Sequence, residues 1–154
     1  MASEIERKFL VDTSQWTPRG AGTPYTQGYL SSAKERTVRV RREGDRAVLT
    51  IKGPTHGITR LELEYPIPLA DAAAMFPLCE QPLIEKVRHT EDHGGRMWEI
   101  DVFSGDNAGL VVAEIELPDE HTAFEVPAWA IREVSDDPRY YNANLIANPY
   151  KNWR

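Results

Sequence analysis

The chain has 154 residues, of which 18 are Lys or Arg and 24 are Asp or Glu, and its formal net charge is −6. This length suits one domain with a hydrophobic core and hardly two, so we expect a single domain over residues 1–154. The acidic balance argues against a general surface for nucleic acid or for an anionic membrane. It does not exclude an anionic ligand, because the local grouping of basic residues decides that question.

The single cysteine, Cys79, cannot form an internal disulfide, which indicates a reducing compartment. The N-terminal segment has no apolar run that resembles a signal peptide, and no stretch reaches membrane-spanning length. We therefore expect a cytoplasmic protein that does not associate with membranes.

Proline and glycine interrupt the chain at short intervals, and the segments between them are rich in β-branched and aromatic residues. This pattern is typical of many antiparallel strands. The sequence REGDR at 42–46 predicts a hairpin turn between two of them. The predicted strands cover residues 3–11, 25–31, 36–43, 46–53, 58–67, 83–91, 95–103 and 109–118.

Helical signals are few. Residues 69–76 are rich in alanine and end at Pro77, residues 119–124 could form one or two turns, and a last short helix is predicted around 139–146. The fold class is therefore mainly β with a few short helices. An antiparallel set of this size forms a sandwich or a barrel, since bare sheet edges favour aggregation.

Charged residues keep one parity on most of the predicted strands, and apolar residues keep the other. Side chains alternate between the two faces of a strand, so residues of one parity share a face. On the first strand, Glu6 and Lys8 oppose Ile5 and Phe9. A solvated face is the ordinary explanation for a single strand. Here, however, like charges recur two residues apart on several strands, which costs stability unless opposite charges neutralise them.

The charges of this shared parity balance one another, seven against seven. If the sheet closes with these faces inside, its interior is a hydrated, charge-lined tunnel. Arginine and lysine suit a polyanion such as a phosphate chain, and carboxylates are oxygen ligands suited to Mg²⁺ or Mn²⁺. The pattern therefore predicts a metal-assisted polyphosphate site. Its acidic members are Glu4, Glu6, Glu62, Glu64, Asp101, Glu114 and Glu116, and its basic members are Lys8, Arg39, Arg41, Lys52, Arg60, Lys86 and Arg88.

The opening EIERKFLV resembles the ExExK motif of the CYTH superfamily, also called the triphosphate tunnel metalloenzymes. Further matching segments follow in family order and span nearly the whole chain. The short length and the RYYNANL ending are similar to the compact bacterial members that hydrolyse inorganic triphosphate. The further segments are QGYL (27–30), VRVRR (38–42), LTIKG (49–53), RLELEY (60–65), EKVR (85–88), EIDVF (99–103), AEIEL (113–117) and EVSDDPRYYNANL (133–145).

The resemblance implies a closed eight-stranded antiparallel β-barrel that binds a triphosphate chain and a divalent metal, Mg²⁺ or Mn²⁺, as two ions. Lys8 and Tyr29 resemble a Lys–Tyr pair that helps to activate water, with the alternative that Lys8 only holds a charge. Metal ligands are expected at Glu4, Glu6, Asp101, Glu114 and Glu116, phosphate contacts at Lys8, Arg39, Arg41, Lys52, Arg60, Lys86 and Arg88, and lining positions of unassigned role at Glu62 and Glu64.

The expected function is hydrolysis of inorganic triphosphate to diphosphate and phosphate. Two alternatives stay open at this point. One is an organic triphosphate enzyme of the same fold, acting on thiamine triphosphate or cyclising ATP, and the other is a polyphosphate-binding module without turnover. The expected partner is a small polyphosphate, with no nucleic acid and no membrane, and a homodimer is left open.

Overall fold

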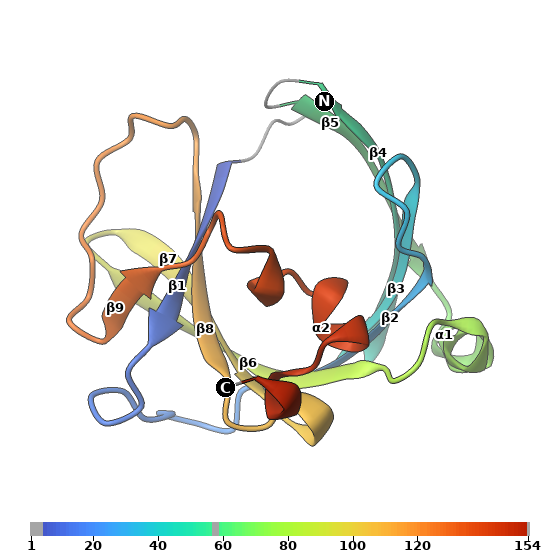
Figure 1. The fold of residues 1–154 in the computed structure, drawn as a ribbon, viewed down its shortest axis with the longest axis horizontal. Coiled ribbons are helices and arrows are strands. Elements are labelled where there is room, and N and C mark those ends of the chain that lie inside the picture. The colour runs from blue at the N-terminus through green and yellow to red at the C-terminus, as the bar shows by residue number, and fades with distance from the viewer. Residues whose placement is uncertain (1–4, 57–58, 154) are drawn as a thin grey trace.

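The computed structural model describes residues 5–56 and 59–153. Its main element is a curled antiparallel sheet that surrounds a central space, with the C-terminal segment lying across that space (Figure 1). The strands are β1 (Ile5–Val11), β2 (Thr23–Ser31), β3 (Thr37–Glu43), β4 (Arg46–His56), β5 (Thr59–Ile67), β6 (Ile84–His93), β7 (Arg96–Phe103), β8 (Val111–Leu117) and β9 (Ala130–Glu133).

The mainly β tunnel fold and all eight predicted strands are confirmed, but the sheet differs from the expected barrel in two respects. It has nine strands in the order β5-β4-β3-β2-β6-β7-β8-β1-β9. Within the described residues, no strand pairing joins β5 to β1 or β9, so hydrogen bonds do not close the barrel. The end of the second edge of β1, from Phe9 to Val11, pairs instead with β9, where Leu10 lies opposite Arg132.

Three of the helical predictions can be compared with the structure. The helix at 69–76 is confirmed as α1 (Leu69–Met75), followed by the 3-10 turn η1 (Phe76–Leu78). The prediction at 119–124 is wrong, because the Asp119 carboxylate accepts the backbone N–H of His121 and the hydroxyl of Thr122 and so stabilises a turn. The tail contains η3 (Pro138–Tyr140), α2 (Asn144–Ala147) and η4 (Tyr150–Asn152) in place of one helix over 139–146, and η2 (Gly105–Asn107) precedes β8.

The predicted hairpin turn joins β3 to β4. Gly44 has a φ of +64°, a left-handed conformation that glycine adopts without steric cost. A second glycine, Gly28 on β2, is required for packing, because a Cβ there would lie 2.9 Å from Cys79 Cβ. No helix within the described ranges is both long and apolar enough to cross a membrane.

Apolar packing lies on both faces of the sheet. Outside, Phe9, Trp98 and Trp129 belong to a buried cluster beside β1, β7 and β8, while α1 covers Val40 of β3. A third cluster joins the tail to the strands: Tyr140, Leu145 and Ile146 pack with Tyr29, Ile84, Phe103, Leu110 and Val112. Tyr29 also lines the central cavity, so the tail fills part of the space enclosed by the sheet.

Candidate active site

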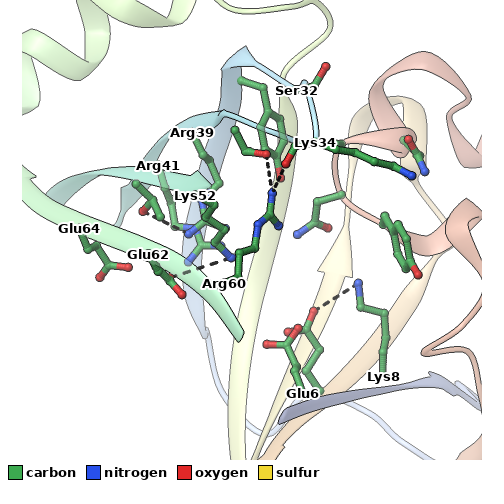
Figure 2. Close-up of a pocket in the computed structure, with 18 of the residues that line it drawn as sticks. Glu6, Lys8, Ser32, Lys34, Arg39, Arg41, Lys52, Arg60, Glu62 and Glu64 are labelled. Carbon is green, nitrogen blue, oxygen red and sulfur yellow. Dashed lines mark hydrogen bonds and ion pairs between the residues drawn. The ribbon is translucent and has the colours of Figure 1, made fainter. Parts of the chain in front are cut away.

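A cavity of about 940 Å³ occupies the centre of the curled sheet. Its lining comes from the charged faces of the strands, which therefore point inward as their parity predicts, and from residues 141–144 of the tail. Figure 2 shows basic side chains of β3 and β4 on one side and Glu6 and Lys8 of β1 on another. The predicted residues that line it are Glu6, Lys8, Tyr29, Arg39, Arg41, Lys52, Arg60, Glu62, Glu64, Arg88, Glu114 and Glu116. Glu4 lies outside the described residues.

Two predicted site residues, Lys86 and Asp101, do not line the cavity. Their side chains are 0% and 1% exposed, and Lys86 Nζ lies 2.8 Å from Asp101 Oδ2. Arg88 donates to both oxygens of the same carboxylate, from Nε at 2.8 Å and from Nη2 at 2.9 Å. Both Asp101 oxygens therefore contact cations of the chain, and neither Lys86 nor Asp101 belongs to the cavity lining. The metal-ligand role of Asp101 and the phosphate contact of Lys86 stay predictions.

In the buried triad of Lys86, Arg88 and Asp101, the pairing favours the charged forms of Asp101 and Arg88, whereas burial outweighs Asp101 at Lys86 and lowers the pKa of its ammonium group. Burial alone would raise the pKa of Asp101, but Lys86 and Arg88 overcome this effect and hold it well below its usual range. Burial alone would lower the pKa of Arg88, and the bonds to Asp101 raise it instead. The triad therefore fixes the position of Arg88, whose side chain still lines the cavity and also contacts Glu99 at 3.1 Å.

The basic wall, which we define as Arg39, Arg41 and Lys52 on β3 and β4, is not satisfied in this way. Burial and the nearby Arg41 lower the pKa of Arg39, and burial and Arg39 lower the pKa of Lys52. Arg39 Nε is buried without a hydrogen-bond partner in the described part of the chain. Its Nη2 lies 3.4 Å from Thr50 Oγ1. Because these shifts disfavour the charged forms, a bound anion would stabilise the wall.

Two of these cations are held by neighbours at the cavity wall. Arg41 Nε donates to Gln27 Oε1 at 3.1 Å, and Gln27 is fully buried. Lys52 Nζ lies 4.0 Å from Glu62 Oε1, which places Glu62 beside the basic wall. Glu64 lies on the same strand two residues further on (Figure 2). These carboxylates reduce the positive charge of the wall without removing it.

Arg60 lines the cavity but most of its hydrogen bonds go to the protein itself. Its Nε donates to the Gly53 carbonyl at 2.6 Å, and its Nη2 donates to the Lys34 carbonyl at 3.1 Å and to Thr37 Oγ1 at 2.9 Å. These contacts tie β4 and β5 to the connection between β2 and β3. Nε and Nη2 of Arg60 therefore form a structural link, and the phosphate contact expected at Arg60 stays a prediction.

The acidic wall, defined as Glu6, Glu114 and Glu116 on β1 and β8, lies on the other side. Glu6 pairs with Glu116 in the strand register, and Lys8 pairs with Glu114. The Glu6 side chain is exposed to the cavity but enclosed by its walls. This loss of bulk water, followed by repulsion from Glu114, raises the pKa of Glu6 to about 8. In the protonated form it donates a hydrogen bond to Glu114.

Glu114 behaves differently because it has a cation beside it. Burial alone would raise its pKa, but Lys8, with Nζ at 3.6 Å from Glu114 Oε1, outweighs burial and the pKa is lowered. The two neighbouring carboxylates Glu6 and Glu114 therefore favour different protonation states. A divalent cation between them would remove the repulsion that raises the pKa of Glu6.

This donor set fits a divalent metal in chemistry, since carboxylate oxygens are the ligands that Mg²⁺ and Mn²⁺ prefer. The residues that would hold it are Glu6 and Glu114, with Glu116 on the same wall. Within residues 5–56 and 59–153, no group of three or more Asp, Glu, His or Cys side chains is already assembled as a metal site. A metal would therefore draw these carboxylates together as it binds.

Lys8 connects the acidic wall to the C-terminal tail. Its Nζ donates to the Tyr140 carbonyl at 3.0 Å, and its backbone N–H donates to Ser135 Oγ at 2.9 Å. Tyr29 is buried and lines the same cavity. In the part of the chain described here, no hydrogen bond joins Tyr29 to Lys8, and their joint role in activating water stays a prediction.

Several residues of the cavity were absent from the sequence prediction. Glu99 lies beside Arg88 and shares the parity of Asp101 on the same strand, so the alternation contained a signal for it. Lys34, in the connection between β2 and β3, and residues 141–144 lie outside strands, where parity gives no information. Behind the lining, the buried Gln27, which accepts a hydrogen bond from Arg41, gave no signal because its side chain is neutral.

Together, the curled sheet and the opposed walls define a class of protein: a charged β-tunnel built to hold an anion and a cation side by side. Comparisons with known proteins agree with this class. The CYTH domain family model matches residues 2–145. The chain therefore belongs to the CYTH domain family.

Two relatives share most of their length with this chain. It is 49% identical over 155 residues to an inorganic triphosphatase of Acetivibrio thermocellus, covering 100% of this chain and 99% of the relative. It is 35% identical over 149 residues to an inorganic triphosphatase of Nitrosomonas europaea, covering 93% and 96%. A crystal structure described as an inorganic triphosphatase superposes with a TM-score of 0.70 at 33% identity, covering 95% of each chain.

Proposed function

We propose that this protein hydrolyses inorganic triphosphate to diphosphate and phosphate inside the cavity. The observation that supports this most directly is the pair of opposed walls. Burial and like charges disfavour the charged forms of Arg39 and Lys52 in one wall and of Glu6 in the other, so each wall gains from a bound partner of opposite charge. A polyphosphate carrying divalent metal supplies both. The relatives named inorganic triphosphatase support the choice of substrate.

The basic wall is the proposed phosphate-binding surface. Triphosphate carries a charge of roughly −4 to −5 near neutral pH, given a last phosphate pKa of about 6. Arg39 and Arg41 offer planar donor pairs that match phosphate oxygens, and Lys52 adds a point charge. Arg88, whose position is fixed by Asp101, adds a fourth cation from β6.

The acidic wall is the proposed metal site. Triphosphate tunnel enzymes of this family depend on metal, and we propose Mg²⁺ or Mn²⁺, as two ions, held by Glu6, Glu114 and Glu116 together with phosphate oxygens. When bound, the metal supplies charge neutralisation and lowers the pKa of a coordinated water. We retain Glu4 as a further proposed ligand on the basis of its sequence position alone.

The reaction asks the protein mainly for positioning and for stabilisation of charge, as phosphoryl transfer does in general. Water attacks a terminal phosphorus, the bond between that phosphorus and the bridging oxygen breaks, and diphosphate leaves with the bridging oxygen. Arg39, Arg41 and Lys52 orient the chain for in-line attack. Glu62 and Glu64 lie beside these cations and moderate their charge.

Lys8 lies between the Tyr140 carbonyl, which accepts a hydrogen bond from Nζ, and Glu114, with which Nζ forms an ion pair at 3.6 Å. This environment favours a role in which Lys8 holds charge near the reacting phosphate, while Tyr29 orients water or phosphate from the buried end of the cavity. Substituting Lys8→Ala separates this role from that of a general base. If Lys8 is the base, the acidic limb of the pH–rate profile disappears; if it holds charge, the limb stays in place while turnover falls.

One assay tests the proposed function. The purified protein is incubated with triphosphate, ATP, thiamine triphosphate and long-chain polyphosphate, with and without Mg²⁺ or Mn²⁺, and the release of phosphate and cyclic AMP is followed. We expect metal-dependent phosphate release with triphosphate as the best substrate. Preference for ATP or thiamine triphosphate would contradict the proposed substrate, and binding without turnover would indicate a polyphosphate-binding module.

A further inference from the structure

The connection between β2 and β3 carries a cation, Lys34, at the cavity opening. Its side chain is exposed and belongs to the lining of the cavity. Across the described residues, Lys34 has no ion pair with a carboxylate. Figure 2 shows Lys34 and Lys8 entering the cavity from opposite sides, with Arg60 beside the backbone of Lys34. Lys34 is therefore available to contact an anion that binds the basic wall and extends from it toward the cavity opening.

The loop that carries Lys34 is held at both ends by side chains from other parts of the fold. At its start, the Glu80 carboxylate accepts hydrogen bonds from the backbone N–H of Ser32 at 3.2 Å and from its hydroxyl at 2.9 Å. At its end, Arg60 Nη2 donates to the Lys34 carbonyl and to Thr37 Oγ1. Thr37 also donates to the Ala33 carbonyl at 3.2 Å.

These contacts matter because a lysine on a free loop would lose much conformational entropy on binding. Anchored backbone positions reduce that loss and keep the ammonium group near the opening. Arg60 anchors the Lys34 carbonyl itself, so it controls the position of this residue more directly than any other contact of the loop. The adjacent Glu35 also lines the cavity and opposes an anion there.

Resting on the proposed function, we propose that Lys34 is a further substrate-binding residue that contacts the outer, non-reacting phosphate of triphosphate, and that Arg60 is the positioning residue that holds it there. The inner cations hold the part of the chain that reacts. Lys34 then contributes to binding of substrate and transition state alike, so its loss raises KM and leaves kcat nearly unchanged.

The test compares two variants of the same loop. Lys34→Gln and Arg36→Gln remove the same charge, but Arg36 is exposed and does not line the cavity. We measure the affinity for inorganic triphosphate by calorimetry and the kinetics of its hydrolysis. For Lys34→Gln we expect about a tenfold loss of affinity and a matching rise in KM. For Arg36→Gln we expect a change of less than about twofold. Equal effects of the two variants would overturn the proposal.

The role of Arg60 is tested by a double-mutant cycle. Arg60→Gln should raise KM and lower triphosphate affinity, and adding Lys34→Gln to it should cost little more. If the loss of affinity in the double variant equals the product of the losses in the two single variants, Arg60 acts independently of Lys34. If Arg60→Gln fails to fold, Thr37→Val serves instead, because it removes only one Arg60 contact at the end of the loop and the Thr37 bond to Ala33.

Binding and turnover separate the two proposals. If the wild-type protein binds triphosphate but does not hydrolyse it, the proposed function fails, while the affinity ratio between Lys34→Gln and Arg36→Gln still tests Lys34. If the wild type turns over triphosphate and the two variants match it in affinity and KM, the proposed function stands and the assignment of Lys34 fails.

Discussion

The buried triad and the cavity walls differ in how far the protein stabilises the charged forms of their side chains. In the triad, Asp101 lies between Lys86 and Arg88, and the pairing holds the pKa of Asp101 well below its usual range. In the walls, burial and like neighbours lower the pKa of Arg39 and raise that of Glu6. Asp101 and Arg88 thus have their charged forms stabilised by pairing within the chain, whereas the charged forms of Arg39 and Glu6 are disfavoured until a ligand of opposite charge binds.

The largest effect is expected at the acidic wall. Glu114→Gln removes the carboxylate that lies between Glu6 and Lys8, so the metal loses a ligand and the cavity loses charge balance. We expect the rate of triphosphate hydrolysis to fall about 1,000-fold and the metal concentration for half-maximal activity to rise. Titrating Mg²⁺ and Mn²⁺ at saturating triphosphate measures both.

Glu85→Gln is the control for this change, because Glu85 is exposed and does not line the cavity. It removes the same charge and should leave rate and metal requirement unchanged. Similar losses in both variants would show that net charge, and not a local metal site, explains the result.

The second largest effect is expected at the basic wall. Arg39→Gln should lower kcat/KM for triphosphate about 100-fold, because a charge-assisted contact to phosphate is lost. The same change should leave the metal-free protein at least as stable to heat, since burial disfavours the Arg39 charge. Steady-state kinetics and thermal unfolding without metal check the two halves of this prediction.

Arg42→Gln is the matched control, since Arg42 is exposed on the opposite face of β3 and its Nε donates to the Gly44 carbonyl. It should keep full activity. A clear loss of stability in Arg39→Gln would contradict the view that the wall is unsatisfied without ligand.

The third prediction concerns the triad. Asp101→Asn leaves two buried cations without their counterion, so we expect the free energy of unfolding to fall by about 3 kcal/mol or more. Denaturant unfolding measures it. Asp106→Asn breaks an exposed ion pair with Lys151 and should cost less than about 1 kcal/mol. If Asp101→Asn unfolds like wild type but needs a higher metal concentration for half-maximal hydrolysis, Asp101 acts as a metal ligand and not as the counterion of the triad.

The smallest effect is a pH dependence of the metal-free protein. The pKa of Glu6 is raised in the folded state to about 8, above the value of 4.5 for the free side chain. The folded state therefore binds the Glu6 proton more tightly, and the stability it contributes is complete below pH 4.5 and is lost as the pH rises through 8. Thermal unfolding in a chelator should show this decline in wild type and a smaller one in Glu6→Gln. Parallel curves would contradict the assigned pKa shift.

Sequence reasoning predicted the inward faces of the strands because the pleat imposes a period of two on every strand. Parity could not predict which inward-facing side chains reach the cavity. Lys86 and Asp101 have the inward parity, yet they are buried in contact with each other and with Arg88 and do not line the cavity. Parity also could not predict the hydrogen-bond partners of Arg60, because two of its acceptors are the backbone carbonyls of Gly53 and Lys34 on other segments of the chain.

The edge strand β9 was also missing from the strands predicted from the sequence. β9 has only four residues, three of them exposed, so it carries little hydrophobic pattern, and only its pairing with β1 makes it a strand. Parity gave no information on the tail positions 141–144 or on the loop residue Lys34, because alternation has meaning only within strands, and the family resemblance over 133–145 assigned no role to residues 141–144. The unpredicted part of the site is therefore the part built from loops and long-range contacts.

The bond between Lys8 and the Tyr140 carbonyl joins the first strand to the last segment of the chain. During synthesis, all strands can form before residues 140–144 leave the ribosome, but the cavity is complete only afterwards. A chain cut before residue 138 would carry the charges of both walls without the carbonyl that fixes Lys8. It would also expose the inner apolar cluster that Tyr140, Leu145 and Ile146 cover. The ability to act on a substrate is thus coupled to the presence of residues 140–146, which complete the cavity and cover the inner cluster.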